Sequence, residues 1–428
     1  MSATEQNTQD HGLLRFLTCG SVDDGKSTLI GRLLYDTKAI LADTLHAIER
    51  TSHKRGMTAV DLSLLTDGLQ AEREQGITID VAYRYFSTGR RKYIIADAPG
   101  HEQYTRNMVT AASTADLAII LVDARKGVLT QTRRHSFLAH QVGIPQLVVA
   151  VNKMDLVDYD QAVFEKIRQG YLAFAEQLGI QGVRFIPLSA LNGDMVVDRG
   201  EALSWYDGPT LLDILEAAGT ADSEAAAGFR FPVQYVCRPQ ESANPELHDY
   251  RGFMGRVETG SVAVGDPVAV LPSGRETRIK DIQLGGESRP DAIAGESVTL
   301  LLEDEIDISR GDMIVPAAPA EARPDAAKQI QAVVCWLGET PLDRARTYLI
   351  RHTTREVKAK VAAIVHKLDI NSLEHLPADR LAMNDIARVD FKLAQPVFAD
   401  AYRDNRATGA FILIDESTNN TVGAGMIG

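Results

Sequence analysis

The sequence predicts a multidomain protein of the α/β plus all-β class, with a mostly parallel sheet covered by helices on both faces and then two β-barrel domains. From Leu13 to about Ala218, short apolar runs alternate with longer amphipathic segments, which is typical of a parallel α/β sheet. Beyond that point the apolar residues alternate with a period of two and turn residues interrupt them, which indicates antiparallel strands. The length of 428 residues suits about three domains of ~150 residues each.

In the first region, continuous apolar runs such as residues 117–122 suit strands that are buried on both faces. Ligands of such sheets bind at the carboxyl ends of the strands. We expect strands at Leu13–Cys19, Arg91–Asp97, Leu117–Asp123, Gln146–Asn152 and Arg184–Pro187.

The domain boundaries follow from changes in composition. We expect a disordered tail over residues 1–12 and an α/β domain over 13–220, followed by a small-residue, acidic linker. One β-barrel is expected over residues 229–318 and, after a joint rich in proline and alanine, a second over 325–428.

Composition excludes several classes of protein. The net charge of −13 argues against a broad nucleic-acid surface, which needs clustered lysine and arginine. The three cysteines are far apart and form no C-x-x-C pair, which argues against disulfides or a zinc site and favours the cytoplasm. We expect no signal peptide, and no apolar run approaches the ~18 residues of a membrane span.

The pattern G-x-x-x-x-G-K-S follows the first predicted strand and precedes a helical pattern, and it predicts a phosphate-binding P-loop. Its backbone N–H groups converge on phosphate oxygens, and the helix that follows points its positive end at the same place. Lys26 supplies a charge to the β- and γ-phosphates, and the Ser27 hydroxyl suits Mg²⁺. The predicted phosphate-contacting residues are Gly20, Ser21, Val22, Asp23, Asp24, Gly25, Lys26, Ser27 and Thr28.

Two further segments predict a sensor of the γ-phosphate. Asp97-Ala98-Pro99-Gly100 has the D-x-x-G pattern, in which Asp97 holds Mg²⁺ through water and the Gly100 N–H bonds the γ-phosphate. Thr78, between this segment and the P-loop, suits contact with Mg²⁺ and the γ-phosphate. Alone, Asp97–Gly100 equally fits a plain strand-to-turn sequence, and the charged run before Thr78 fits a solvated helix face. The order of the two segments after the P-loop favours the functional interpretation.

Two more strand ends predict recognition of guanine. Asn152-Lys153-Met154-Asp155 has the N-K-x-D pattern, and Ser189-Ala190-Leu191 follows the next predicted strand. The Asp155 carboxylate accepts hydrogen bonds from guanine N1–H and the exocyclic amine, which adenine does not offer. We expect the Ala190 N–H to meet guanine O6, Asn152 to brace the loop and the Lys153 stem to cover the base.

The candidate catalytic residues are Lys26, Thr78 and His101. Placed at the γ-phosphate, His101 orients the attacking water, although a histidine that caps the following helix fits the sequence as well. Asp23 is the candidate ligand of a monovalent cation, and a carboxylate that caps the loop fits it equally. His11, His135 and His140 have no partner spacing, and we expect them on the surface.

The whole chain resembles the translation-factor class of GTPases, a P-loop GTPase domain followed by two β-barrels. More closely it resembles the large GTPase subunit of ATP sulfurylase, in residues 14–34, which include the loop Gly20–Ser27, and in 67–85, 95–107, 123–136 and 152–159. Ile306–Asp312 and Asn420–Met426 in the predicted barrels match as well. The factors that deliver tRNA instead carry histidines beside the Val-Asp of the P-loop, where this chain has Ser21 and Asp24.

That resemblance implies a GTPase that couples hydrolysis, with GTP and Mg²⁺, to the formation of adenosine 5′-phosphosulfate and pyrophosphate from ATP and sulfate. The adenylyl transfer takes place on a separate, smaller catalytic subunit. Some members of the family carry a C-terminal kinase with its own P-loop, and these 428 residues contain one P-loop. The alternatives are an elongation factor that binds aminoacyl-tRNA and a regulatory GTP switch.

Overall fold

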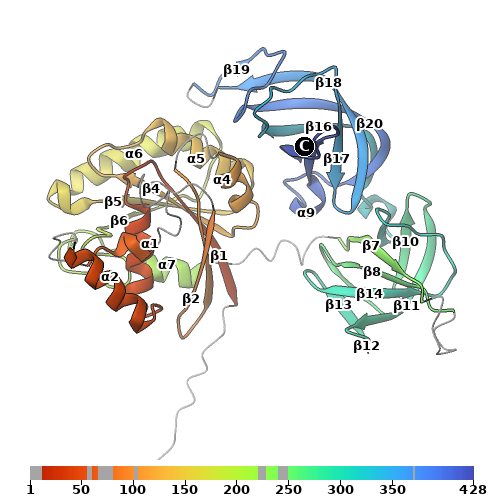
Figure 1. The fold of residues 1–428 in the computed structure, drawn as a ribbon, viewed down its shortest axis with the longest axis horizontal. Helices are drawn as coiled ribbons and strands as arrows, with labels where there is room; N and C mark the ends of the chain where they lie inside the picture. The colour runs from red at the N-terminus through yellow and green to blue at the C-terminus, as the bar shows by residue number, and fades with distance from the viewer. Residues whose placement is uncertain are drawn as a thin grey trace, which may run out of the picture. The chain divides into compact units, whose positions relative to one another are not determined.

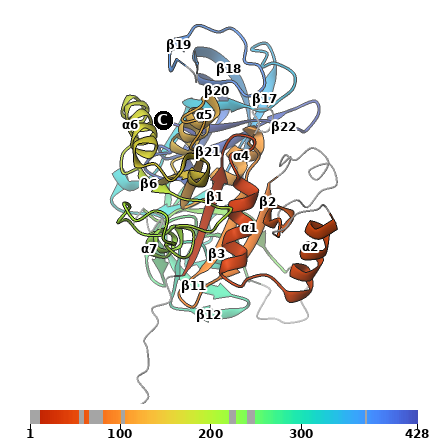
Figure 2. The ribbon, with the colours of Figure 1, turned by 90° about the vertical axis from the view of Figure 1, so that its left-hand side faces the viewer.

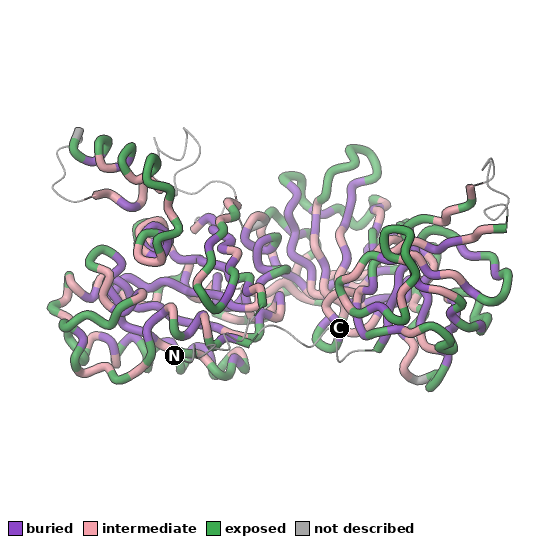
Figure 3. Tube along the Cα trace, turned by 90° about the horizontal axis from the view of Figure 1, so that it is seen from below, coloured by how far each residue is buried: buried purple, intermediate pink, exposed green. Residues whose placement is uncertain are grey.

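The structure is a computed structural model that describes residues 12–54, 60–65, 81–100, 105–219, 228–239, 249–369 and 372–428. The chain forms two compact units that divide near residue 220. No helix in these described ranges is long and apolar enough to cross a membrane. In each unit the buried residues follow the strands and the exposed residues follow the connecting loops (Figure 3).

The first unit is built on a six-stranded sheet in the order β2-β3-β1-β4-β5-β6. All neighbours pair in parallel except β2 and β3, which confirms the mostly parallel sheet. The strands are β1 (Leu13–Cys19), β2 (Ala82–Ser87), β3 (Lys92–Asp97), β4 (Leu117–Asp123), β5 (Gln146–Asn152) and β6 (Arg184–Pro187). Strand β2, which the sequence analysis did not identify, is an edge strand.

Helices cover both faces of this sheet: α4, α5 and α6 lie on one side and α1 and α7 on the other (Figure 1). The helices are α1 (Lys26–Asp36), α2 (Ala42–Lys54), α4 (Thr105–Ala112), α5 (Thr130–Gln141), α6 (Gln161–Gln177) and α7 (Leu211–Ala217), with 3₁₀ turns at Leu62–Leu65 and Met154–Val157. Figure 2 shows α1 in front of β1 and β3. There Phe16, Leu33 and Leu215 belong to one buried cluster, which fixes the helix that follows the P-loop.

The second unit begins with an antiparallel barrel. Its sheet order is β10-β15-β7-β8-β14-β11-β12, and pairing of β10 with β11 closes it. The strands are β7 (Phe231–Cys237), β8 (Gly252–Arg256), β9 (Ser261–Ala263), β10 (Pro267–Leu271), β11 (Arg275–Leu284), β12 (Glu287–Arg289), β13 (Asp291–Ile293), β14 (Ser297–Leu302) and β15 (Met313–Pro316). Alternate residues of these strands, such as Val298, Leu300 and Leu302, fill its core.

A second closed barrel completes the unit, in the order β17-β21-β22-β16-β20-β18-β19 with β17 paired to β18. Its elements are β16 (Asp325–Trp336), β17 (Thr347–His352), β18 (Arg355–Leu368), β19 (His375–Leu376), β20 (Ile386–Ala399), α9 (Arg406–Gly409), β21 (Ala410–Asp415) and β22 (Thr421–Ile427). Trp336 packs edge-on against Tyr348 in its core. The two predicted barrels are therefore confirmed, and the boundaries 13–220, 229–318 and 325–428 stay proposals.

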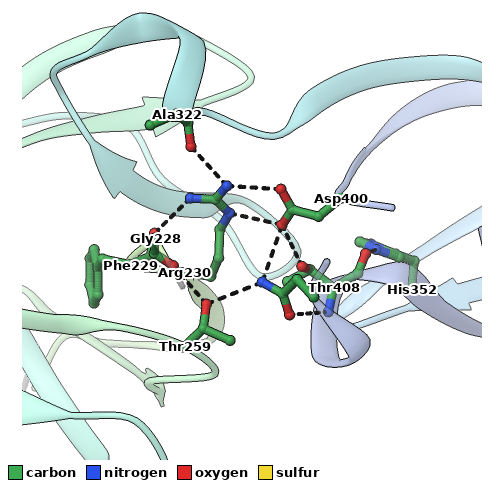
Figure 4. Close-up of polar contacts among 9 residues, drawn as sticks. Gly228, Phe229, Arg230, Thr259, Ala322, His352, Asp400 and Thr408 are labelled. Atoms are coloured by element: carbon green, nitrogen blue, oxygen red, sulfur yellow. Dashed lines mark hydrogen bonds and ion pairs between the residues drawn. The ribbon is translucent and has the colours of Figure 1, made fainter. Parts of the chain in front are cut away.

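Buried polar contacts join the two barrels (Figure 4). Arg230 is 5% exposed and donates from Nε and Nη2 to the Asp400 carboxylate at 3.0 and 2.8 Å. Nη2 also donates to the Ala322 carbonyl at 2.8 Å. Asn405 donates to Thr259 Oγ1 at 3.2 Å. Next to these contacts, Phe398 of the second barrel packs with Met313 and Val315 of the first.

Replacing Arg230 with Met is expected to destabilise the second unit by about 3–5 kcal/mol, because it leaves the Asp400 carboxylate, which is only 17% exposed, without its cation. Urea unfolding monitored by circular dichroism measures the loss. Arg256→Ala, which removes an exposed ion pair with Glu258, is the control and should cost less than about 1 kcal/mol. A loss for Arg230→Met no larger than this control would contradict the inference.

Candidate functional site

The loop between β1 and α1 depends on a glycine at residue 25 for its conformation. Gly25 caps α1 with φ +90°, and a Cβ there would lie 2.4 Å from the Asn152 side-chain nitrogen. The Asp24 N–H donates to the Ser21 carbonyl at 3.1 Å. Residue 25 must therefore be glycine, both for its left-handed backbone and for the close approach of Asn152.

Lys26 and Asp97, the predicted phosphate and metal residues, form an ion pair at the sheet edge. Their side chains are 9% and 2% exposed. Parallel pairing of β1 with β3 brings the end of β3 beside the start of α1. Gly100 also approaches the P-loop, since a Cβ there would lie 2.2 Å from the Gly20 carbonyl oxygen. The D-x-x-G segment and the P-loop are thus in direct contact.

The two adjacent aspartates of the P-loop differ in burial. Asp24 is 1% exposed, and its Oδ2 accepts the Ser21 N–H at 2.7 Å. Burial raises the pKa of Asp24 to about 6. Asp23 is exposed, and its carbonyl accepts from Lys153 Nζ. Asp24 therefore caps the loop, and the monovalent cation at Asp23 stays a prediction.

Asn152 connects the P-loop with the loop after β6. Its Nδ2 donates to the Asp24 carbonyl at 2.8 Å, and its Oδ1 accepts the Ala190 N–H at 3.0 Å. The residue is 2% exposed, so both bonds are shielded from water. The Ala190 N–H, which we predicted would meet guanine O6, has this protein acceptor in the structure.

The Asp155 carboxylate is held at the mouth of the site. Its Oδ1 accepts from Ser189 Oγ at 2.7 Å, and that hydroxyl accepts the Asn192 N–H at 3.2 Å. Asp155 is half-buried, and Leu191 is 60% exposed beside it. A carboxylate that is fixed through one oxygen and accessible to solvent suits recognition of two adjacent donors on a base.

Asp123 lies at the same edge of the sheet, and the sequence analysis did not single it out. It ends β4 directly beside Asn152, is 1% exposed, and lies 3.1 Å from Lys153 Nζ. Burial opposes its charged form, but hydrogen bonds from Arg125 and Lys153 outweigh burial and hold the pKa well below its usual range. Its place at the end of a buried strand was the available signal, and its role is to fix the Lys153 stem.

The remaining predicted residues divide between described and undescribed parts of the chain. Ser27 and Thr28 lie half-buried in the first turn of α1, and Val22 is exposed. Thr78 and His101 lie outside the described residues, so their roles stay predictions. Within the described ranges, no group of three histidine, cysteine or acidic residues is placed to hold a metal ion.

The expectation that His135 lies on the surface is wrong. It is 3% exposed in α5, and its Nδ1 has no hydrogen-bond partner in the described part of the chain. Burial, with the nearby charges of Arg134 and Lys26, lowers the pKa of His135 to about 4. The structure thus places a neutral imidazole within the electrostatic reach of the P-loop lysine.

Comparison with known proteins gives matches over both units. Residues 11–220 match the elongation factor Tu GTP binding domain, and residues 329–428 match the GTP-eEF1A C-terminal domain-like family. The chain is 55% identical over 417 residues to sulfate adenylyltransferase subunit 1 of Laribacter hongkongensis, covering 97% of this chain and 85% of that protein. For the protein of the same name from Cellvibrio japonicus, the identity is 54% and the coverage 97% and 86%.

Of two further matches, one is to a longer protein and the other has a much lower sequence identity. The bifunctional enzyme NodQ of Rhizobium sp. (strain N33) is 53% identical over 417 residues, which cover 97% of this chain and 63% of that protein. Among solved structures, sup35 complexed with GDP is 22% identical with a TM-score of 0.43, and the match covers 100% of this chain and 96% of that one.

The buried His135 gives a prediction for the pH dependence of stability. Its pKa is about 4 in the folded protein and about 6.5 in an unfolded chain, so only the unfolded state binds a proton between these values. Its contribution is therefore complete above pH 6.5 and is lost as the pH falls to 4, by roughly 3 kcal/mol in total.

Urea unfolding at pH 7.5, 6 and 5 measures this effect. We expect His135→Leu to lose less stability on acidification than the wild type. His53→Gln, at an exposed position of α2, should keep the wild-type slope. Equal slopes for wild type and His135→Leu would show that the imidazole is not buried in its neutral form.

Proposed function

Since the chain belongs to the sulfate adenylyltransferase subunit 1 family, we propose that it is the GTPase subunit that couples GTP hydrolysis to sulfate activation. A smaller catalytic partner makes adenosine 5′-phosphosulfate and pyrophosphate from ATP and sulfate. A phosphate–sulfate anhydride is unfavourable to form, so its synthesis needs a favourable reaction to drive it. Hydrolysis of GTP on this chain supplies that driving reaction.

The observation that carries the proposal is the meeting of four sequence motifs at one edge of the sheet. Lys26 and Asp97 contact each other, and Asn152 bonds both the P-loop and Ala190. Asp155 is held by Ser189. The phosphate end and the base end of the site are thereby joined through Asn152, as recognition of one guanine nucleotide requires.

The residues act at the two ends of the nucleotide. Lys26 and the N–H groups of the P-loop bind the phosphates, and Asp155 accepts the guanine N1–H and amine. Mg²⁺ fits hard oxygen ligands from Ser27, Thr78 and Asp97, and when bound it neutralises charge on the β- and γ-phosphates. His101 orients the attacking water, and Asp23 takes a monovalent cation in this proposal.

The change at the γ-phosphate is the signal that reaches the partner. The Gly100 N–H bonds the γ-phosphate in the GTP state and loses that bond after hydrolysis. The D-x-x-G segment contacts the P-loop backbone, so its position is sensitive to that bond. In this proposal, the catalytic partner distinguishes the position of the D-x-x-G segment before hydrolysis from its position afterwards.

A GTPase assay with the smaller subunit tests the coupling. GTP turnover is expected to rise by at least about tenfold when the partner, ATP and sulfate are all present. Coupling requires that fast GTP hydrolysis takes place only in the complex that holds both other substrates. Reactions that lack one component, together with Lys26→Ala, serve as controls. Turnover indifferent to sulfate and partner would refute the coupling and leave a GTP switch as the alternative.

A base-specificity variant tests the guanine assignment. Asp155→Asn replaces one of the two acceptor oxygens with a donor, which then faces a donor of guanine, and should weaken GTP binding by about a hundredfold. Xanthosine triphosphate should bind this variant better than GTP, because its O2 accepts from the new amide. Asp158→Asn, at a nearby exposed position, is the matched control. Unchanged GTP affinity in Asp155→Asn, measured by calorimetry, would place the base elsewhere.

A further inference from the structure

Tyr159 joins the two segments that we assign to the base, the N-K-x-D loop (residues 152–159) and the Ser189 turn (residues 189–194). It lies four positions after Asp155. Its hydroxyl donates to Asp194 Oδ2 at 2.6 Å and accepts from Asn192 Nδ2 at 3.0 Å. One phenol therefore holds the Ser189 turn against the N-K-x-D loop.

These contacts form a ring that returns to the Asp155 carboxylate. The Asn192 N–H donates to Ser189 Oγ at 3.2 Å, and Ser189 Oγ donates to Asp155 Oδ1 at 2.7 Å. Ser189 is buried and Tyr159 is half-buried. The N-K-x-D loop is therefore attached to the Ser189 turn at two points, through Asp155 itself and through Tyr159.

The backbone of the N-K-x-D loop needs this support. Lys153, Asp158 and Tyr159 have φ angles of +64°, +54° and +54°, in the left-handed region that residues other than glycine rarely adopt. Such conformations persist only where the surrounding contacts determine them. The Tyr159 N–H donates to the Met154 carbonyl at 2.9 Å, and the Tyr159 carbonyl accepts from Trp205 Nε1 at 2.8 Å. Together with the hydroxyl, every polar group of Tyr159 is hydrogen-bonded.

The Asp194 carboxylate is placed to accept the Tyr159 hydroxyl. A Cβ at Gly200 would lie 2.3 Å from Asp194 Oδ1, so a glycine at residue 200 leaves the room that this carboxylate occupies. The Asp194 carbonyl also accepts the Ser189 N–H at 3.2 Å. Burial and the hydrogen bond to Asp194 raise the pKa of Tyr159 above its usual value. The hydroxyl therefore keeps its proton and remains the donor.

We propose that Tyr159 is a positioning residue for guanine recognition, which holds the N-K-x-D loop in the strained conformation that presents the Asp155 carboxylate to the base. This role rests on the proposed function, because it requires that a guanine nucleotide binds at this loop. A carboxylate that is already ordered accepts the guanine N1–H and amine with little further loss of loop entropy, so the hydroxyl of Tyr159 contributes to affinity without touching the base.

Inosine diphosphate isolates the contact between Asp155 and the exocyclic amine, because it lacks only that amine relative to GDP. Tyr159→Phe removes only the hydroxyl. We expect this variant to bind GDP about tenfold more weakly and inosine diphosphate about threefold more weakly, so that the preference for GDP falls about threefold. GDP makes two hydrogen bonds with the carboxylate and inosine diphosphate makes one, so a less ordered carboxylate weakens GDP binding more. Competition calorimetry measures both affinities.

Tyr206→Phe is the matched control. Tyr206 is also half-buried, and its hydroxyl donates to the Phe185 carbonyl of β6 at 3.1 Å, so this variant should keep the wild-type affinity and preference. Asn192→Ala, at an exposed position, removes the other bond to the Tyr159 hydroxyl and should lower the preference for GDP by a smaller factor. Thermal unfolding checks that each variant is folded, and Asn192→Ala decides the question if Tyr159→Phe is not.

The outcomes are separable. An equal loss of affinity for both nucleotides in folded Tyr159→Phe, or no loss for either, would overturn the positioning role. A fall in preference as large in Tyr206→Phe as in Tyr159→Phe would overturn it as well, because the effect would then not depend on the Ser189 turn. Wild-type protein that binds ADP as tightly as GDP would instead refute the proposed function itself. A selective fall in the preference for GDP supports both.

Discussion

The arrangement of the site depends on one buried amide, the side chain of Asn152. It bonds the backbone of the P-loop through Nδ2 and the backbone at Ala190 through Oδ1. The contact is possible because β5 ends beside β4 and β1 ends beside both β3 and β4 in one parallel sheet. Gly25 leaves the space that Nδ2 occupies. Register, a missing side chain and one amide together fix the distance between the phosphate end and the base end.

The two lysines of the site at this edge of the sheet are each paired with an aspartate. Lys26 pairs with Asp97, and Lys153 pairs with Asp123. Asp24, in contrast, is buried inside the loop, where its Oδ2 accepts the Ser21 N–H and burial raises its pKa to about 6. The loop therefore carries two adjacent aspartates of different character, one buried in the loop and one exposed to solvent.

Much of this was predictable from the sequence, for identifiable reasons. The strands with continuous apolar runs, such as β4 and β5, were predicted to the residue because burial on both faces leaves an unambiguous pattern. Strand β2 was missed because only Phe86 is buried in it. His135 was misjudged because α5 is buried over a wider face than its polar sequence suggests. Asp123 was missed because its contact with Lys153 joins two separate loops, which no local pattern encodes.

The junction between the barrels has a mechanical consequence. Arg230 with Asp400 and Phe398 with Met313 and Val315 tie one barrel to the other through both charge and apolar contact. A twist applied to either barrel would have to break this ion pair, and so leave the buried Arg230 charge without its partner, before the two barrels could turn separately. A force applied to one barrel is therefore passed to the other through these contacts, and the two barrels are expected to move together as one body.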